Sequence, residues 1–139
     1  MSVPDAGLLA TWNDCGFYRL VGMRVVRADA DGSRLEVTVG PEHLQAYGTA
    51  HGGVTAGLLD AAMGLAAIAA VLPGEGCATV EMKLNFTAAA RPGPLAAEGR
   101  VLHLGRRLVT AAAEARDAGG ALVAVAQGTF ARFPLEAGS

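Results

Sequence analysis

The most constraining feature of the sequence is one long apolar segment with a single charge inside it. Residues 52–74 are mostly alanine, glycine and leucine, and Asp60 is the only charged residue among them. A helix that is apolar on all sides must be covered on all sides, by lipid or by a protein core. A carboxylate inside a membrane span is costly, and no Lys or Arg flanks either end closely. We therefore expect a core helix from residue 52 to about 72.

The remainder of the chain has the pattern of short strands. Before the long helix, residues 20–28 are rich in β-branched side chains, and residues 34–39 alternate between apolar and polar. After it, strand-like runs separated by Gly/Pro turns follow in the order 79–87, 95–104, 107–116 and 121–133. Near the N-terminus, Leu8, Leu9, Trp12 and Cys15 at helical spacing predict a short amphipathic helix over about 5–16.

This order of elements indicates an α+β protein. A curved antiparallel sheet wrapped around the long helix covers the helix on every side, which is the hotdog fold. A chain of 139 residues has the length of one domain with one core. We expect a single hotdog domain over residues 1–139, with its core from about 17 to 133.

The composition excludes several classes of partner. Hydrophobic residues make up 52% of the chain, charged residues 17%, and the formal net charge is −2. That balance offers no basic face for nucleic acid. The two cysteines, Cys15 and Cys77, are too few for a disulfide framework and stand in no metal-ligand spacing. Residues 1–5 lack a basic segment leading into an apolar run, so we expect a cytoplasmic protein with no membrane partner.

The residues best suited to catalysis or ligand binding lie at the start of the long helix and inside it. Gly52 and Gly53 stand at its N-terminus, where backbone N–H groups have no intrahelical partner and the helix dipole is positive. Such a terminus can act as an oxyanion hole for a thioester carbonyl under attack. Asp60, in an otherwise apolar helix, must be paired, hydrated or functional.

The spacing of Gly52 and Asp60 predicts an assembly. Eight residues along one helix correspond to about 12 Å, at about 1.5 Å per residue. A carboxylate or its water must attack the same carbonyl that the N–H groups polarise, and this requires contacts of about 3 Å. We therefore expect the site to combine Gly52 of one subunit with Asp60 of another, in an obligate dimer.

These residues also resemble a known family. The triplet 51–53 (His-Gly-Gly), the acid nine positions after the His, the strand 79–86 and the turn at 91–93 resemble the acyl-CoA thioesterases of the phenylacetate-pathway and 4-hydroxybenzoyl-CoA type. The resemblance runs from about residue 17 to 133. It implies hydrolysis of an aromatic or medium-chain acyl-CoA to the free acid and CoA, with no metal or redox cofactor and with CoA entering only as part of the substrate. It also implies a homodimer with a continuous sheet, and pairing of dimers into tetramers.

The resemblance assigns catalytic roles to particular residues. Asp60 resembles the catalytic carboxylate, as general base or nucleophile, and Gly52 supplies the oxyanion amide. His51 resembles the residue that stabilises the loop-to-helix turn. Gln45 corresponds to an amide near the thioester carbonyl or the attacking water, and Thr79 to a hydroxyl that positions water.

Further residues are candidates for substrate binding. One branch of the family has a Thr one helical turn after its acid; here that residue is Gly64, which favours the phenylacetate-type branch. Candidates for the acyl pocket, the helix terminus and the CoA phosphates are Gly53, Met63, Lys83, Arg91, Arg106 and Arg107.

Alternative interpretations stand beside this one. Asp60 could be a structural acid paired with an arginine. The whole chain could be a non-catalytic acyl-CoA-binding or regulatory hotdog domain, a hydratase or dehydratase of the same fold, or a dimerisation module. An acid inside the helix argues against the non-catalytic binding domain and against the dimerisation module. The His-Gly-Gly pattern argues against the hydratase or dehydratase.

Overall fold

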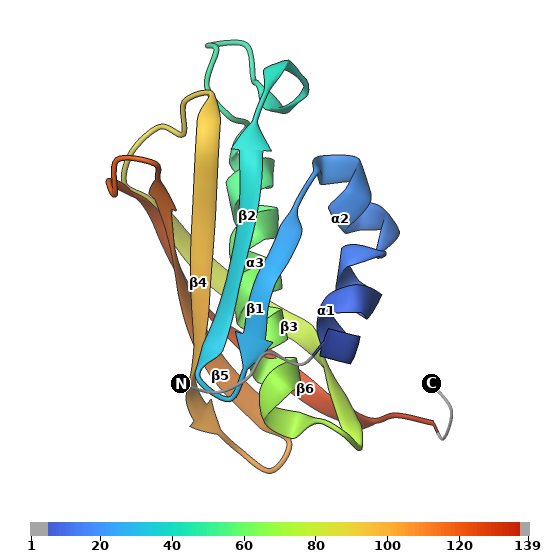
Figure 1. Ribbon diagram of the computed structural model, residues 1–139. Helices are drawn as coiled ribbons and strands as arrows, with labels where there is room; N and C mark the ends of the chain where they lie inside the picture. The colour runs from blue at the N-terminus through green and yellow to red at the C-terminus, as the bar shows by residue number, and fades with distance from the viewer. Residues whose placement is uncertain (1–5, 137–139) are drawn as a thin grey trace.

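The computed structural model describes residues 6–136 and has the hotdog fold, with one long helix wrapped by a curved antiparallel sheet (Figure 1). The fold class predicted from the sequence is therefore confirmed. In chain order the elements are α1 Ala6–Asn13, α2 Gly16–Val21, β1 Arg24–Asp29, β2 Gly32–Val39, the 3-10 turn η1 Pro41–His43, α3 Gly52–Val71, β3 Glu75–Phe86, β4 Gly93–Leu104, β5 Leu108–Asp117 and β6 Leu122–Pro134.

All six strands belong to one sheet in the order β1-β2-β4-β5-β6-β3, and each pairs antiparallel with its neighbours. The edges are β1 and β3. Strand β3 pairs with β6 from Glu75 to Phe86, with a register shift between Thr79 and Glu81. Its other side has no strand partner in the part of the chain that the structure describes.

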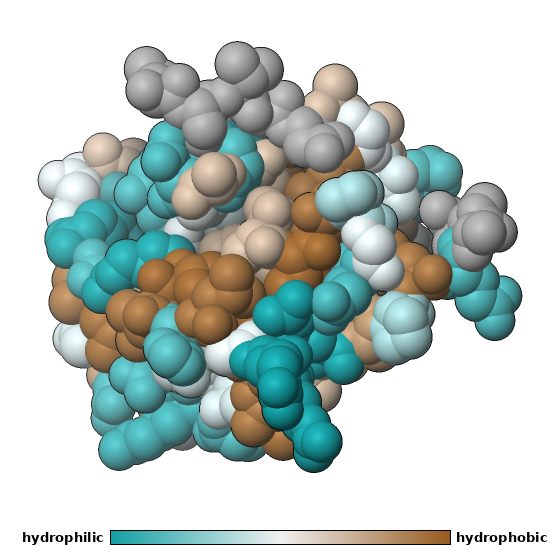
Figure 2. All heavy atoms as spheres, turned by 90° about the horizontal axis from the view of Figure 1, so that it is seen from below, coloured by the Kyte–Doolittle hydropathy of each residue, from teal (hydrophilic) through white to brown (hydrophobic). Residues whose placement is uncertain are grey.

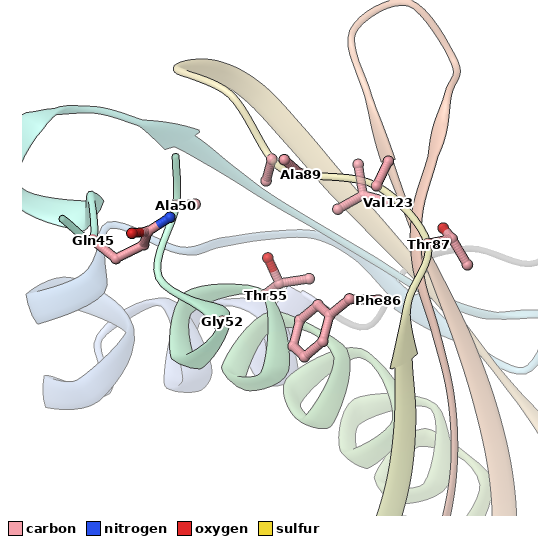
Figure 3. A pocket seen from close by; sticks show the side chains of 10 residues that line it. Gln45, Ala50, Gly52, Thr55, Phe86, Thr87, Ala89 and Val123 are labelled. Carbon is pink, nitrogen blue, oxygen red and sulfur yellow. The ribbon is translucent and has the colours of Figure 1, made fainter. Parts of the chain in front are cut away.

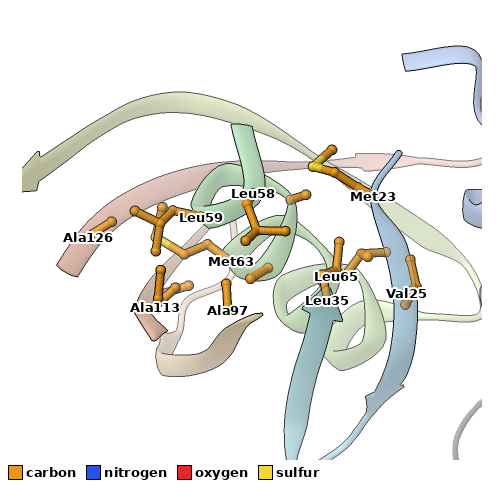
Figure 4. Packing of buried hydrophobic residues seen from close by; sticks show 14 of the residues in the cluster. Met23, Val25, Leu35, Leu58, Leu59, Met63, Leu65, Ala97, Ala113 and Ala126 are labelled. Carbon is orange, nitrogen blue, oxygen red and sulfur yellow. The ribbon is translucent and has the colours of Figure 1, made fainter. Parts of the chain in front are cut away.

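Helix α3 forms the centre of the core. Leu58, Leu59 and Met63 are completely buried, and small residues of the strands, such as Ala97 and Ala113, face the helix (Figure 4). By length and composition alone the helix could cross a membrane, but 61% of its most apolar stretch is buried within the chain. Packing inside the sheet accounts for that composition.

The helix approaches the sheet most closely at Ala62. The Ser33 hydroxyl of β2 donates a 2.5 Å hydrogen bond to the Ala62 carbonyl. A Cβ atom at Gly99 of β4 would collide with the same carbonyl oxygen. Glycine at position 99 is therefore required for this helix–sheet distance.

The N-terminal region differs from the sequence prediction. Residues 20–21 end helix α2, and β1 begins only at Arg24, so the strand predicted over 20–28 is wrong in its first part. Gly22 ends the helix in the left-handed conformation (φ 82°), and its N–H donates to the Tyr18 carbonyl at 2.8 Å. This is a glycine C-cap, a signal outweighed in the sequence by the β-branched residues that follow. The helix predicted from about 5 to 16 is α1 followed by the start of α2; residue 5 lies outside the described residues.

The boundaries after α3 also shift. Strand β3 begins at Glu75, four residues before the predicted start at 79, because residues 75–78 already pair with the end of β6. Gly76 and Cys77, in this early part of β3, share a hollow with residues of α1 and of the second half of α3. The pairing of residues 75–78 with β6 therefore helps to position Thr79, the next residue of the strand.

Candidate active site

The N-terminus of α3 presents one amide without a partner. His51 is the N-cap, and its Nδ1 accepts a 2.9 Å hydrogen bond from the Gly53 N–H. The Val54 N–H donates to the His51 carbonyl at 2.9 Å. Within residues 6–136, the Gly52 N–H has no acceptor. His51 thus stabilises the turn, as expected, and leaves Gly52 as the amide available to a ligand.

Gly52 lines a hollow that we call the amide cavity, of about 370 Å³ (Figure 3). Its walls come from the loop before α3, the first turn of α3, the end of β3 with the loop that follows it, and the start of β6. The lining residues are Gln45, Ala50, Gly52, Thr55, Phe86, Thr87, Ala88, Ala89, Ala90 and Val123. A Cβ atom at Gly52 would lie 3.1 Å from the Phe86 ring, so the ring covers this glycine closely.

Gln45 reaches the amide cavity from a loop that fixes its side chain. Its Oε1 accepts from the Tyr47 N–H, and its Nε2 donates to the Thr49 hydroxyl, both at 2.6 Å. The amide group therefore has a defined orientation at the cavity wall. Each of its two polar atoms retains hydrogen-bonding capacity for a ligand.

Asp60 lies two turns further along α3 and has a polar partner from the sheet. The Thr79 hydroxyl donates a 2.7 Å hydrogen bond to Asp60 Oδ1. Thr79 stands directly before the register shift in β3, a type of irregularity that re-aims side chains. Among the described residues no Lys, Arg or His forms an ion pair with Asp60, so the structural acid–arginine alternative has no partner to support it.

Asp60 and Thr79 open into a second hollow of about 260 Å³, which we call the carboxylate cavity. Its walls are mainly apolar and come from α1, α2, α3, β3 and β6. The lining residues are Trp12, Cys15, Phe17, Tyr18, Gly57, Asp60, Ala61, Gly64, Leu65, Ile68, Cys77, Ala78, Thr79 and Phe130. A half-buried carboxylate in such surroundings is suited to take a proton from water held beside it.

Tyr18 lies in the buried part of the carboxylate cavity wall. Tyr18 is only 6% exposed, and burial is the main cause that raises the pKa of its hydroxyl, with the neighbouring Cys15 and Asp60 acting in the same direction. The hydroxyl therefore stays protonated through the physiological range.

The amide cavity and the carboxylate cavity share no lining residue. Gly52 and Gln45 line one, and Asp60 and Thr79 line the other. One chain thus does not bring its own Gly52 together with its own Asp60, in agreement with their spacing of about 12 Å along the helix.

The basic candidates are dispersed. Arg91 lies in the turn before β4, while Arg106 and Arg107 follow the end of β4, so the whole strand separates them, roughly 36–40 Å at about 3.3 Å per residue. Within a single chain, Arg91 therefore cannot hold the same phosphate as Arg106 or Arg107. Lys83 lines another surface hollow with Glu81, Asn85 and Gln127.

Two other candidates have structural roles. Met63 is completely buried and lines neither cavity, because it lies on the side of α3 that faces Ala97 and Ala113 (Figure 4). The Gly53 N–H already donates to His51, so Gly53 serves the helix cap. Neither residue lines the amide cavity or the carboxylate cavity.

Several residues at the site were missed by the sequence analysis. Phe17 and Tyr18 reach the carboxylate cavity from α2, which the sequence prediction did not contain. Thr55 is 2% exposed, and its hydroxyl points into the amide cavity (Figure 3). Its position three residues after Gly52 was the signal that could have identified it. No group of three or more His, Cys, Asp or Glu suited to a metal ion occurs within residues 6–136.

The fold and site together define a hotdog protein with a carboxylate on its central helix and an open amide at the start of that helix. The model of the thioesterase superfamily matches residues 47–124, a range that contains Gly52, Asp60 and Thr79. The chain belongs to this superfamily.

Individual relatives agree with that assignment. A Pseudomonas aeruginosa protein with the name "Putative esterase" is 33% identical over 132 residues, which cover 94% of this chain and 97% of that protein. A thioesterase structure from Haemophilus influenzae matches with a TM-score of 0.87 at 19% identity, over 99% of this chain and 97% of the other. The PaaI protein of the E. coli phenylacetic acid degradation operon matches with a TM-score of 0.82 at 21% identity, over 89% and 88%. The two structures show likeness of fold.

Proposed function

We propose that the protein hydrolyses an acyl-CoA thioester to the free acid and CoA, at sites shared between two subunits. Asp60 and Thr79 of one subunit act together with Gly52 and Gln45 of the other. The observation that carries this proposal is the 2.7 Å hydrogen bond from Thr79 to a carboxylate that has no cationic partner within residues 6–136 and opens into an apolar cavity.

The chemistry follows from these groups. As general base, Asp60 takes a proton from water, and the hydroxide adds to the thioester carbonyl carbon. The carbonyl oxygen gains negative charge and accepts a hydrogen bond from the Gly52 N–H. Collapse of the tetrahedral intermediate breaks the C–S bond and releases CoA, whose sulfur receives the proton that Asp60 took from water. In the alternative route Asp60 attacks the carbonyl itself and displaces the CoA thiolate, and water then hydrolyses the mixed anhydride to the free acid and regenerates Asp60. Neither route requires a metal or a redox cofactor.

The edge strand β3 supports a dimer that would complete the site. Thr79 is the fifth of the 12 residues of β3, and Phe86 is the last, beside Gly52. Antiparallel pairing of β3 with its copy around a two-fold axis between Met82 and Lys83 would set Thr79 opposite the partner's Phe86. Asp60 of each subunit would then come close to the amide cavity of the other. Val80 and Phe86, 59% and 54% exposed on this edge, would be covered.

The decisive experiment combines two inactive variants. Thiol release from aromatic and medium-chain acyl-CoAs is measured for the native protein, for Asp60→Asn and for Gly52→Pro. Proline is suited to the first helical position and removes the N–H, and the His51 ψ of 138° is compatible with a following proline. Its Cβ atom would lie 3.1 Å from the Phe86 ring, a contact that an alanine at this position shares. Loss of one oxyanion donor lowers kcat by about 10²–10³-fold, and we expect both variants to fall at least that far. Gly52→Ala, which keeps the N–H, is the matched control.

Mixing the two variants tests the shared site. After exchange of subunits at equal amounts, about half of the dimers are mixed, and each has one intact site, so activity should recover to about one quarter of the native value. If each chain contained its own complete site, mixing would restore nothing. Binding of acyl-CoA by the native protein without thiol release would instead identify a binding domain.

A further inference from the structure

A third hollow lies directly beside the carboxylate cavity. This terminal cavity has a volume of about 350 Å³ and is enclosed by α1, the end of α3, the start of β3 and the end of β6. It is lined by Gly7, Leu8, Thr11, Trp12, Ile68, Leu72, Gly76, Cys77, Phe133 and Leu135. Figure 2 shows the molecule from below, and apolar residues are gathered on this face.

Three residues line both the carboxylate cavity and the terminal cavity: Trp12, Ile68 and Cys77. They form the partition between the two spaces. Trp12 has the largest side chain of the three, and its ring packs against Tyr18 with the ring centroids 5.7 Å apart. Tyr18 is itself buried, so it holds the indole in place.

The volumes of the two cavities indicate how the partition between them would limit the length of a bound acyl group. The carboxylate cavity has a volume of about 260 Å³ and ends at the partition, so it offers room for a short acyl group. Joining the 350 Å³ of the terminal cavity to it would more than double the space and would extend it away from Asp60.

We propose that Trp12 is the floor of the acyl pocket and restricts the enzyme to arylacetyl and medium-chain acyl groups. The inference rests on the proposed thioesterase function and adds its substrate class. The acyl group enters the carboxylate cavity from the reacting carbon beside Asp60, contacts the apolar walls and ends against the indole. The terminal cavity is apolar apart from Thr11 and stays out of reach while Trp12 is present.

The test is the acyl-chain profile of Trp12→Ala. We expect kcat/KM to fall sharply in the native protein between octanoyl-CoA and dodecanoyl-CoA. In Trp12→Ala the ratio of dodecanoyl-CoA to octanoyl-CoA should rise about tenfold or more, because added methylenes become buried. Most of the change should lie in KM, since the reacting groups are untouched.

Two further variants control the experiment. Leu9→Ala shortens a partly buried side chain of the same helix that lines neither cavity, so its profile should remain native. Trp12→Leu keeps an apolar side chain and replaces the alanine variant if that one does not fold; its profile should shift in the same direction. An unchanged profile in the folded Trp12 variant, or native activity on dodecanoyl-CoA equal to that on octanoyl-CoA, would overturn the inference and leave the thioesterase intact. Absence of thiol release from every acyl-CoA would instead reject the function on which it rests.

Discussion

The Thr79 hydroxyl orients the Asp60 carboxylate by donating a hydrogen bond to one of its two oxygens. Hydrogen bonds to charged groups contribute more than neutral ones. In the proposed reaction this contact would hold the carboxylate in one orientation, and Thr79 would act through Asp60 as a positioning residue.

Replacing Thr79 with valine removes this hydrogen bond while keeping the shape of the side chain. A hydrogen bond to a charged group is worth about 1.5–3 kcal/mol, so we expect kcat to fall about 10- to 100-fold, with KM almost unchanged. Steady-state kinetics on an acyl-CoA substrate measure this split. Thr79→Ser restores the donor and should retain most of the activity. Equal losses in the serine and valine variants would show that the hydroxyl has no such role.

For individual residues, the sequence predicts the polar candidates for catalysis better than the apolar residues that line the cavities. Asp60, Gly52 and Gln45 belong to one continuous motif with a recognisable spacing. Tyr18 and Phe17 reach the carboxylate cavity only because α2 packs beside α3, and nothing in their local pattern indicates this tertiary contact. Met63 shows the reverse case: only three residues from Asp60, it is completely buried in the core and lies near Ala97 and Ala113 of the sheet (Figure 4).

At the scale of elements, the close contact between α3 and the middle of the sheet determines where both cavities lie. The Ser33 hydroxyl and the missing side chain at Gly99 allow the Ala62 carbonyl to approach β2 and β4. A helix held further from the sheet would move Asp60 away from Thr79, because the two residues stand on different elements.

We expect Gly99→Ala to destabilise the fold. The added Cβ would collide with backbone rather than with a flexible side chain, so the helix or strand must shift, at a cost of about 1–3 kcal/mol. Chemical unfolding of the variant and the native protein gives this difference. Gly74→Ala is the matched control, because a Cβ atom there meets nothing within 4 Å. A stability for Gly99→Ala equal to that of the control would contradict this account.

The sequence predicts the long elements well because their periodicity extends over many residues. Helix α3 and strands β4 to β6 appear within a few residues of their predicted bounds. Helix α2 has only 6 residues, too few for a periodic signal, and its end is determined by the left-handed conformation of Gly22. The early start of β3 likewise depends on pairing with a strand almost sixty residues later, as between Glu75 and Pro134.

At the scale of the whole molecule, the edge of β3 that has no strand partner among residues 6–136 is the candidate dimer surface. It is a strand of 12 residues that includes exposed Val80 and Phe86, and edges of this length and composition are normally covered. The proposed dimer would extend the sheet across this edge and would complete two sites at the same time.

Val80→Asp should weaken that dimer, because pairing would bury a carboxylate without a cationic partner. We expect light scattering to show a shift from an even multiple of the 14.0 kDa chain mass toward the monomer, with thiol release falling in parallel. Leu102→Asp introduces the same charge at an exposed leucine of β4, away from this edge, and should keep a mass of at least two chains. A monomeric native protein that is fully active would reject the shared site.

Because Trp12 lies on α1, substrate range and fold stability would depend on different residues. Helix α1 lies outside the sheet; Leu8 is its one buried residue, while Leu9 and Trp12 are partly buried against the core. Under the proposed role of Trp12, substitutions at position 12 would change which acyl groups are accepted while most contacts between α3 and the strands are kept. Related proteins could diverge in substrate range through this peripheral helix, while the residues that specify the fold stay under their own, independent selection.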